Sequence, residues 1–224
     1  MNKATKNTIN SVLDKYTLAN IAGMGYQVPA EETPLCKLAF KYRTDKCEKI
    51  KHPFTLFYYD LLNSKRWSIG KVLEIGVKIK RPGSHYQHIT GPSLYMWKDF
   101  FPFARIYGAD ADPGVMFQDG RIKTVLADQS KKGDLTNLIE TTGANIDLLI
   151  YDGSHLPQDQ ISTCLRLMPL VKKDVVYVIE DVIDLGIEKK LRRFDTHLIS
   201  LRASNGRRYR DDKLLVVRNA ASWA

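Results

Sequence analysis

The sequence predicts an α/β protein built on a doubly wound, Rossmann-like, mostly parallel seven-stranded sheet that ends in an antiparallel C-terminal hairpin. Short apolar runs rich in β-branched residues alternate along the chain with segments whose apolar residues recur at helical spacing. The last two runs are joined by a loop containing Ser204-Asn205-Gly206, which is typical of a hairpin. Strand–helix steps that close with a hairpin favour a single sheet with helices on its faces.

The expected strands are residues 71–77, 104–109, 122–127, the runs that open at Ile146 and Val175, 196–202 and 213–218. Helices are expected within 12–21, from Pro53, from Pro92, at 132–141, at 157–169 and near 186–191. We expect residues 1–65 to form an N-terminal helical cap or lid and residues 66–224 to form the core, within a single domain overall.

The composition indicates a soluble globular protein, with 44% hydrophobic and 26% charged residues. No apolar run is long enough to span a membrane, and the N-terminus lacks the apolar middle of a signal peptide. The three cysteines have no metal-type spacing, which points to reduced thiols in the cytoplasm. The net charge of +9 suits nucleic acid, an acidic substrate or a solvated surface. We favour the last, because no aromatic RNA-binding pattern accompanies the C-terminal arginines.

Acidic residues follow two of the expected strands in the stretch 146–181. Asp152 ends the first strand, and Glu180 and Asp181 end the second, with the helix 157–169 between them. Such a right-handed crossover places parallel strands side by side, so the three carboxylates should meet at one edge of the sheet. Like charges gathered there suit a Mg²⁺-like ion, although a plain turn and a solvated loop start remain the alternative. Neighbouring residues of a strand point to opposite faces, so Asp181 can join only if the chain turns near Glu180.

A second group of candidates follows the first two strands. Gly76, at the carboxyl end of the first strand, would let a ligand approach the backbone, and an insert at 78–90 delays the next helix. Asp110 ends the second strand, where doubly wound folds hold ribose hydroxyls, at an interval longer than the usual ~20 residues because of the insert. Asp110 and Asp112 could instead be turn formers. The absence of a GxGxxG pattern weakens a dinucleotide assignment.

Residues 40 to 181 resemble the class I S-adenosylmethionine-dependent methyltransferases, and more narrowly the macrocin and mycinamicin type of sugar O-methyltransferases. The matching segments are Thr44-Asp45-Lys46, Thr55 with Tyr58, Leu73-Glu74-Ile75-Gly76, Ser93-Leu94-Tyr95-Met96-Trp97, Tyr107-Gly108-Ala109-Asp110, Asp128-Gln129, Asp152-Gly153-Ser154-His155 and Tyr177-Val178-Ile179-Glu180-Asp181. The last two are the most particular. One departure is Lys78, which replaces the second glycine of the family's first motif.

The resemblance implies an S-adenosylmethionine- and Mg²⁺-dependent O-methyltransferase that acts on a hydroxyl of a sugar or glycosylated small molecule. It implies that Asp152, Glu180 and Asp181 hold Mg²⁺ and that His155 is the general base, with Asp152 as a second catalytic candidate. It places the cofactor across Gly76, the ribose on Asp110 and the adenine near Asp128 and Gln129. The cofactor set as a whole is Glu74, Gly76, Ser93, Asp110, Asp128, Gln129 and Tyr151.

Two alternatives stay open. The basic charge favours a nucleic-acid methyltransferase, although nucleic acid is not the partner we expect. Lys78 favours a protein that keeps the fold for binding and has lost catalysis. The sequence neither requires nor excludes a homo-oligomer, and it names neither the acceptor nor the hydroxyl that is methylated.

Overall fold

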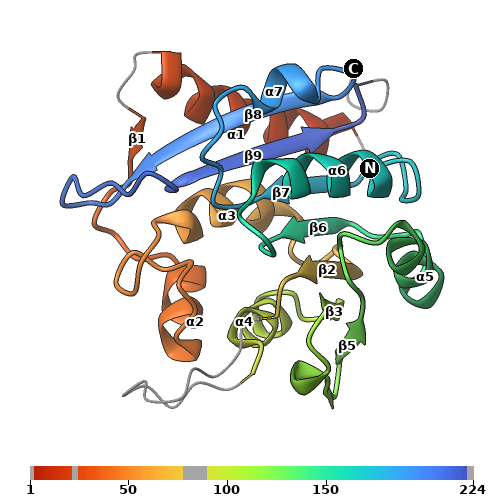
Figure 1. Cartoon of the computed structure of the whole chain (residues 1–224). Coiled ribbons are helices and arrows are strands. Elements are labelled where there is room, and N and C mark those ends of the chain that lie inside the picture. The colour runs from red at the N-terminus through yellow and green to blue at the C-terminus, as the bar shows by residue number, and fades with distance from the viewer. Residues whose placement is uncertain (1–2, 22–24, 78–89, 221–224) are drawn as a thin grey trace.

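The structure is a computed structural model that describes residues 3–21, 25–77 and 90–220 of the chain. Its strands in these ranges are β1 (Tyr26–Gln27), β2 (Lys71–Ile75), β3 (Arg105–Asp110), β4 (Gln118–Asp119), β5 (Ile122–Leu126), β6 (Leu148–Tyr151), β7 (Val176–Ile179), β8 (Asp195–Arg202) and β9 (Lys213–Arg218). They form one sheet in the order β1-β8-β9-β7-β6-β2-β3-β5-β4 (Figure 1). All seven expected strands are present, and the two-residue strands β1 and β4 extend the two edges.

The pairing of the strands confirms the predicted doubly wound topology. Strand β2 pairs in parallel with β3 on one side and with β6 on the other, and β5 and β7 continue the parallel sheet outward. Strand β9 runs antiparallel to both β7 and β8, which is the predicted C-terminal hairpin. The order therefore reverses between β2 and β6, and ligands of such sheets bind in the crevice beyond the strand ends at that point.

Helices cover both faces of the sheet (Figure 1). The α-helices of the described ranges are α1 (Lys3–Ile21), α2 (Pro34–Tyr42), α3 (Phe54–Leu62), α4 (Pro92–Phe100), α5 (Lys132–Thr142), α6 (Pro157–Leu167) and α7 (Ile187–Lys190). Buried side chains of α1, α3 and α4 form one core cluster with one face of the sheet. Those of α5, α6 and α7 form a second cluster on the opposite face.

Side chains that point alternately to the two faces of the sheet explain why the central strands are apolar throughout. In β6, Leu148 and Ile150 belong to the cluster under α1, α3 and α4, whereas Leu149 and Tyr151 belong to the cluster under α5, α6 and α7. Successive side chains of a strand point to opposite faces, so a strand covered on both faces needs apolar residues at nearly every position.

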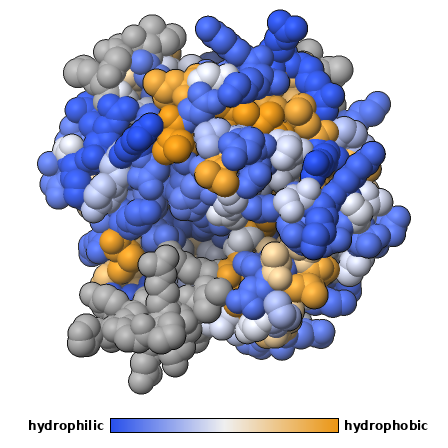
Figure 2. All heavy atoms as spheres, viewed as in Figure 1, coloured by the Kyte–Doolittle hydropathy of each residue, from blue (hydrophilic) through white to orange (hydrophobic). Residues whose placement is uncertain are grey.

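The N-terminal helices are part of this layered core. Ile9, Leu13 and Tyr16 of α1 are fully buried in the first cluster, and α1 begins at Lys3, earlier than the expected segment 12–21. The boundary expected at residue 65 stays a prediction. The described helices include none with the length and apolar character needed to cross a bilayer. Hydrophilic residues cover most of the face seen in Figure 2, with apolar residues in separate patches.

Candidate active site

A cavity of about 370 Å³ lies at the carboxyl ends of the parallel strands. It spans the point between β2 and β6 where the strand order reverses, which is the expected place for a ligand. The predicted site residues among those that line it are Gly76, Ser93, Asp110, Asp128, Gln129, Asp152 and His155. Lys78 and the other residues of the insert 78–90 as far as position 89 lie outside the described residues.

Gly76 brings the ends of β2 and β6 into direct contact. Its φ of +100° is a left-handed conformation that residues with a side chain rarely adopt. A Cβ atom at this position would lie far inside 3.0 Å of the backbone carbonyl of Asp152. A glycine is therefore required here by both conformation and space.

Asp110 both closes the turn after β3 and lines the cavity. Its Oδ2 accepts a hydrogen bond from the backbone N of Val77 at 2.7 Å, and its Oδ1 accepts one from the N of Asp112 at 3.0 Å. The first bond ties the end of β3 to the chain just past Gly76. The turn-forming role and the ligand-binding role considered from the sequence are compatible in this geometry.

Two predicted cofactor residues stand behind the cavity wall. Glu74 is fully buried toward α4, where Trp97 Nε1 donates to its Oε2 at 2.7 Å. Tyr151 is buried in the core cluster on the α6 side. Neither residue belongs to the described lining of the cavity. The residues of β2 and β6 that reach the cavity are those at and beyond the carboxyl ends of these strands. A direct contact with the cofactor is therefore proposed for neither.

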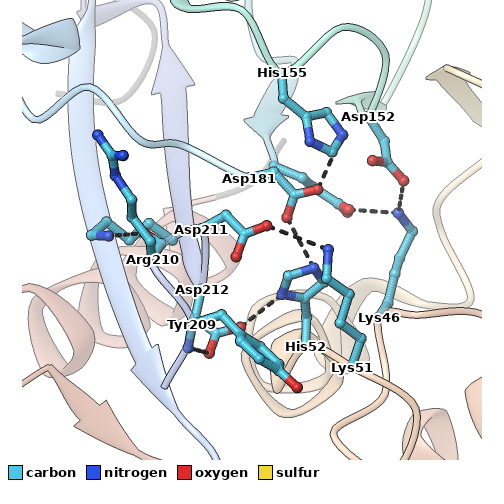
Figure 3. Close-up of polar contacts among 12 residues, drawn as sticks. Lys46, Lys51, His52, Asp152, His155, Asp181, Tyr209, Arg210, Asp211 and Asp212 are labelled. Carbon is cyan, nitrogen blue, oxygen red and sulfur yellow. Dashed lines mark hydrogen bonds and ion pairs between the residues drawn. The ribbon is translucent and has the colours of Figure 1, made fainter.

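Two of the three predicted metal ligands, Asp152 and Glu180, contact a buried lysine, Lys46. Figure 3 shows this lysine beside Asp152. Lys46 Nζ lies 2.5 Å from Glu180 Oε2 and 2.6 Å from Asp152 Oδ2, and its side chain is 1% exposed. It also lies 3.3 Å from Glu74 Oε1, behind the cavity wall. A cation of the protein itself is thus placed among carboxylates from the ends of β2, β6 and β7.

The electrostatics of this cluster follow from burial and from the lysine. Burial alone would lower the pKa of Lys46, but Asp152, Glu180 and Glu74 together raise that pKa well above its ordinary value. Burial raises the pKa of Glu180, and the Lys46 ammonium opposes that shift. The hydroxyl of Tyr58 donates to Glu180 Oε1 at 2.5 Å. Both oxygens of Glu180 therefore have partners within the protein.

Asp181 turns toward the same edge because the backbone changes direction at this residue. Its φ is +54°, which is uncommon outside glycine but tolerated by aspartate. This is the turn that the sequence required for Asp181 to join the cluster. Its Oδ2 lies 3.3 Å from His155 Nε2 and its Oδ1 lies 3.3 Å from His52 Nε2. Burial, with a further contribution from Asp152, raises the pKa of Asp181 to about 6.

The donor set fits a divalent cation. Asp152, His155 and Asp181 offer ligand atoms that all lie within 4.8 Å of one another. Two of the three are carboxylates, which are the ligands that Mg²⁺ prefers in proteins. Glu180, the remaining member of the predicted set, is occupied by Lys46 and Tyr58 and can join only by exchanging Lys46 for the cation.

Sequence reasoning gave no role to Lys46, His52 or Tyr58, although all three lie at the cluster. Lys46 and Tyr58 stood within segments that carried the family resemblance, which was the available signal. His52 had none beyond its place before Pro53. A lysine in a polar loop is normally a surface residue, so only the assembled fold reveals that this one is buried.

The chain is similar to known O-methyltransferases in sequence and to a solved methyltransferase in structure. Demethylmacrocin O-methyltransferase of Streptomyces fradiae is 37% identical over 150 residues, which are 66% of this chain and 36% of the relative. Mycinamicin VI 2''-O-methyltransferase of Micromonospora griseorubida is 34% identical over 166 residues, which are 74% of this chain and 39% of the relative. The MycE methyltransferase from the mycinamycin biosynthetic pathway, solved in complex with Mg and SAH, matches with a TM-score of 0.65 at 25% identity, over 85% of this chain and 55% of that chain.

The chain is a relative of the macrocin- and mycinamicin-type sugar O-methyltransferases. Its fold is the α/β methyltransferase fold of that group, as the sequence predicted. The chain spans less than half the length of the curated relatives that it matches, since it covers 36% of one and 39% of the other. No family model matches the chain.

Proposed function

We propose that the chain is the catalytic core of an S-adenosylmethionine- and Mg²⁺-dependent O-methyltransferase that acts on a hydroxyl of a sugar or glycosylated small molecule. The observation that carries this proposal is one cavity that joins Gly76, Asp110 and Gln129 to Asp152 and His155. The residues proposed for the cofactor and those proposed for acid–base chemistry thus line one cavity, at the point where the strand order of a doubly wound sheet reverses. The relatives with these names support the same activity.

The cofactor half of the cavity would bind S-adenosylmethionine through the residues that reach it. Gly76 lets the ligand lie against the backbone, and Asp110 accepts hydrogen bonds from the ribose hydroxyls. Asp128 and Gln129 line the cavity and would lie by the adenine. Ser93 also lines the cavity and lies in the first turn of α4, and the N-terminus of a helix favours a ligand through its free amide groups. The sulfonium of the bound cofactor supplies the methyl group.

The acid–base half would prepare the acceptor. Asp152 and Asp181 would hold Mg²⁺, with Glu180 joining them in exchange for Lys46, and the bound cation lowers the pKa of an acceptor hydroxyl. His155 lines the cavity with a side chain that is 51% exposed, so an acceptor can reach it. It would accept the hydroxyl proton, and the Asp181 carboxylate 3.3 Å from its Nε2 would then lie beside the imidazolium.

The arginines near the C-terminus do not require nucleic acid as a partner. The Arg207 guanidinium donates to the backbone carbonyls of Glu48 and Lys51, at 3.0 and 2.7 Å. Arg208 donates to Ser200 Oγ at 2.8 Å. Both side chains therefore hold the β8–β9 loop against its neighbours. The cytoplasmic location and a homo-oligomer stay predictions.

Calorimetry with S-adenosylmethionine on Asp110→Ala tests the cofactor assignment. Loss of the ribose contacts should weaken binding by about 10-fold or more. Asp184→Ala is the matched control, because Asp184 Oδ1 closes a similar turn by accepting from Gly186 N at 2.8 Å and lies outside the cavity lining. Equal affinity of Asp110→Ala and the parent would remove the ribose assignment.

Incubation with methyl-labelled S-adenosylmethionine and Mg²⁺ tests the reaction. Nucleotide-sugars, glycans and glycosylated small molecules are offered as acceptors, and label transferred to a hydroxyl is measured. Excess chelator should abolish transfer while the cofactor stays bound. Full turnover in chelator would contradict the role of the cation, and failure to bind the cofactor at all would favour a binding protein that keeps only the fold.

A further inference from the structure

A buried histidine beside the proposed active site has its two ring nitrogens directed at two different carboxylates. His52 is 2% exposed, and its Nδ1 lies 2.7 Å from Asp212 Oδ1, which is also buried. A neutral imidazole that donates from Nδ1 to a carboxylate presents the lone pair of Nε2 on its opposite side. This carboxylate–imidazole pair is the arrangement that orients metal-binding histidines.

His52 Nε2 and Asp181 Oδ1 lie 3.3 Å apart without forming a hydrogen bond. Both atoms are buried, and neither has another hydrogen-bond partner among the residues that the structure describes. In the neutral tautomer that donates from Nδ1 to Asp212, His52 Nε2 and Asp181 Oδ1 are both acceptors. Two buried acceptors that face each other unsatisfied are unfavourable, since each has lost its water and gained nothing in exchange. A cation bound by both atoms would satisfy them together.

Asp211 supplies a third ligand at the same place. Ligand atoms of His52, Asp181 and Asp211 all lie within 4.8 Å of one another, and Figure 3 shows the three side chains converging. Asp211 follows Tyr209 and Arg210 in the loop between β8 and β9, whereas His52 precedes α3, so the site joins segments distant in sequence. Metal–ligand distances of about 2.0–2.2 Å for nitrogen and oxygen suit ligand atoms this close together.

We propose that His52, Asp181 and Asp211 form a second cation site, oriented by Asp212, that binds a divalent metal able to accept nitrogen as well as oxygen. Mn²⁺, Co²⁺ and Zn²⁺ accept imidazole nitrogen beside carboxylate oxygen, whereas Mg²⁺ and Ca²⁺ prefer oxygen alone. At the first site the proposed ligands are the carboxylates of Asp152, Asp181 and Glu180, and His155 is left as the base. Asp181 is shared, because its Oδ2 faces His155 and its Oδ1 faces His52. The second site goes beyond the proposed methyl transfer and does not depend on it.

Lys51 is the group that a metal would have to displace. Its Nζ lies 3.3 Å from Asp211 Oδ2, and its side chain is 37% exposed. A flexible ammonium with access to solvent can leave this carboxylate when a divalent ion binds. Removing the charge of Lys51 should therefore increase the affinity of the second site, which is the opposite of what removing a ligand would do.

The test is the number of Mn²⁺ ions bound per chain, measured by titration with electron paramagnetic resonance. The parent should bind one ion more than His52→Gln and Asp211→Asn, which makes two ions per chain when the first site is also filled. Asp212→Asn should weaken the second site about 10–100-fold, as loss of an outer-shell partner does. Lys51→Met should strengthen it.

His197→Gln is the matched control. His197 Nε2 lies 3.1 Å from Asp195 Oδ1, a comparable histidine–carboxylate pair that belongs to neither ligand group, so the count should be unchanged. In the His155→Gln background, nitrogen coupling to Mn²⁺ should persist, because His52 remains as a ligand. One ion per chain in the parent, with the same affinity in His52→Gln, would overturn the proposal.

Nitrogen NMR of the parent protein tests the second cation site without a variant. Zn²⁺ should shift the Nε2 resonance of His52 while Nδ1 stays protonated. If both ring nitrogens stay protonated at pH 8 and Zn²⁺ leaves them unchanged, His52 is an imidazolium between Asp181 and Asp212 and the second site does not exist. These readouts count ions and protons, so they are independent of whether methyl transfer is found.

Discussion

The Nζ atom of Lys46 lies 2.5 Å from Oε2 of Glu180, with side chains that are 1% and 2% exposed. The pair joins the loop after α2 to the end of β7, across 134 residues of sequence. Buried carboxylates repel one another and avoid ionisation unless a positive charge lies among them. Lys46 provides that charge for Glu180, Asp152 and Glu74 together, so it holds the carboxylates of the candidate active site in place.

Replacement of Lys46 by Met should lower the free energy of unfolding by about 3–5 kcal/mol at pH 7, because it leaves buried carboxylates without their partner. Urea unfolding measures the change. The double variant Lys46→Met/Glu180→Gln should recover part of the loss, since one uncompensated charge is gone. Lys15→Met is the control: Lys15 pairs with Asp60 at 2.9 Å but is 46% exposed, and exposed pairs contribute about 0–1 kcal/mol. Equal effects of the two single variants would contradict this role for Lys46.

Asp181→Asn should stabilise the metal-free protein at neutral pH. The pKa of Asp181 is raised from 3.8 to about 6 in the folded state, so the folded protein favours the neutral carboxyl. The stability that this group contributes is present below about pH 4 and is lost as the pH rises to about 6. The Asn variant cannot ionise, so it should match the parent at pH 4 and exceed it by about 1–3 kcal/mol at pH 7.5. Denaturant unfolding in chelator at both pH values measures the difference, and a constant offset would argue against the shift.

His155→Gln should reduce turnover by roughly 10²–10⁴, the usual contribution of a positioned base, while the affinity for S-adenosylmethionine changes little. A histidine base must be neutral to accept a proton, so turnover of the parent should fall at acid pH. The pH–rate profile of the variant should lack this fall. His197→Gln, outside the cavity lining, should behave as the parent. If His155→Gln keeps the parent's profile, Asp152 becomes the better candidate for the base.

Gly76→Ala should cost more stability than Gly120→Ala. Both glycines have positive φ, at +100° and +55°, so each alanine carries backbone strain on the order of 1–2 kcal/mol. A Cβ at Gly120 meets no atom of the described part of the chain within 4 Å, whereas one at Gly76 collides with the backbone of Asp152. The difference in unfolding free energy therefore reports the contact between the ends of β2 and β6. We expect it to be accompanied by loss of cofactor affinity in Gly76→Ala alone.

Much of the site could be predicted because it depends on strand ends. Parallel strands that neighbour each other bring their carboxyl ends to one edge, so Asp152 and Glu180 had to lie close once β6 and β7 were recognised. The same argument placed Gly76 and Asp110 on one cavity. It did not place Glu74 or Tyr151, whose side chains alternate away from the cavity into the two layers of the core.

By itself the sequence determined the alternation of strands and helices, the hairpin at the end and the strand ends that carry acid. These follow from local hydrophobic periodicity and from turn residues, which act over a few positions of the chain. Only the tertiary structure decided that Lys46 is buried among carboxylates, that His52 lies between Asp181 and Asp212, and that the backbone turns at Asp181. Each of these depends on side chains more than a hundred residues apart or on a strained φ that the surrounding packing imposes, and no local pattern encodes either.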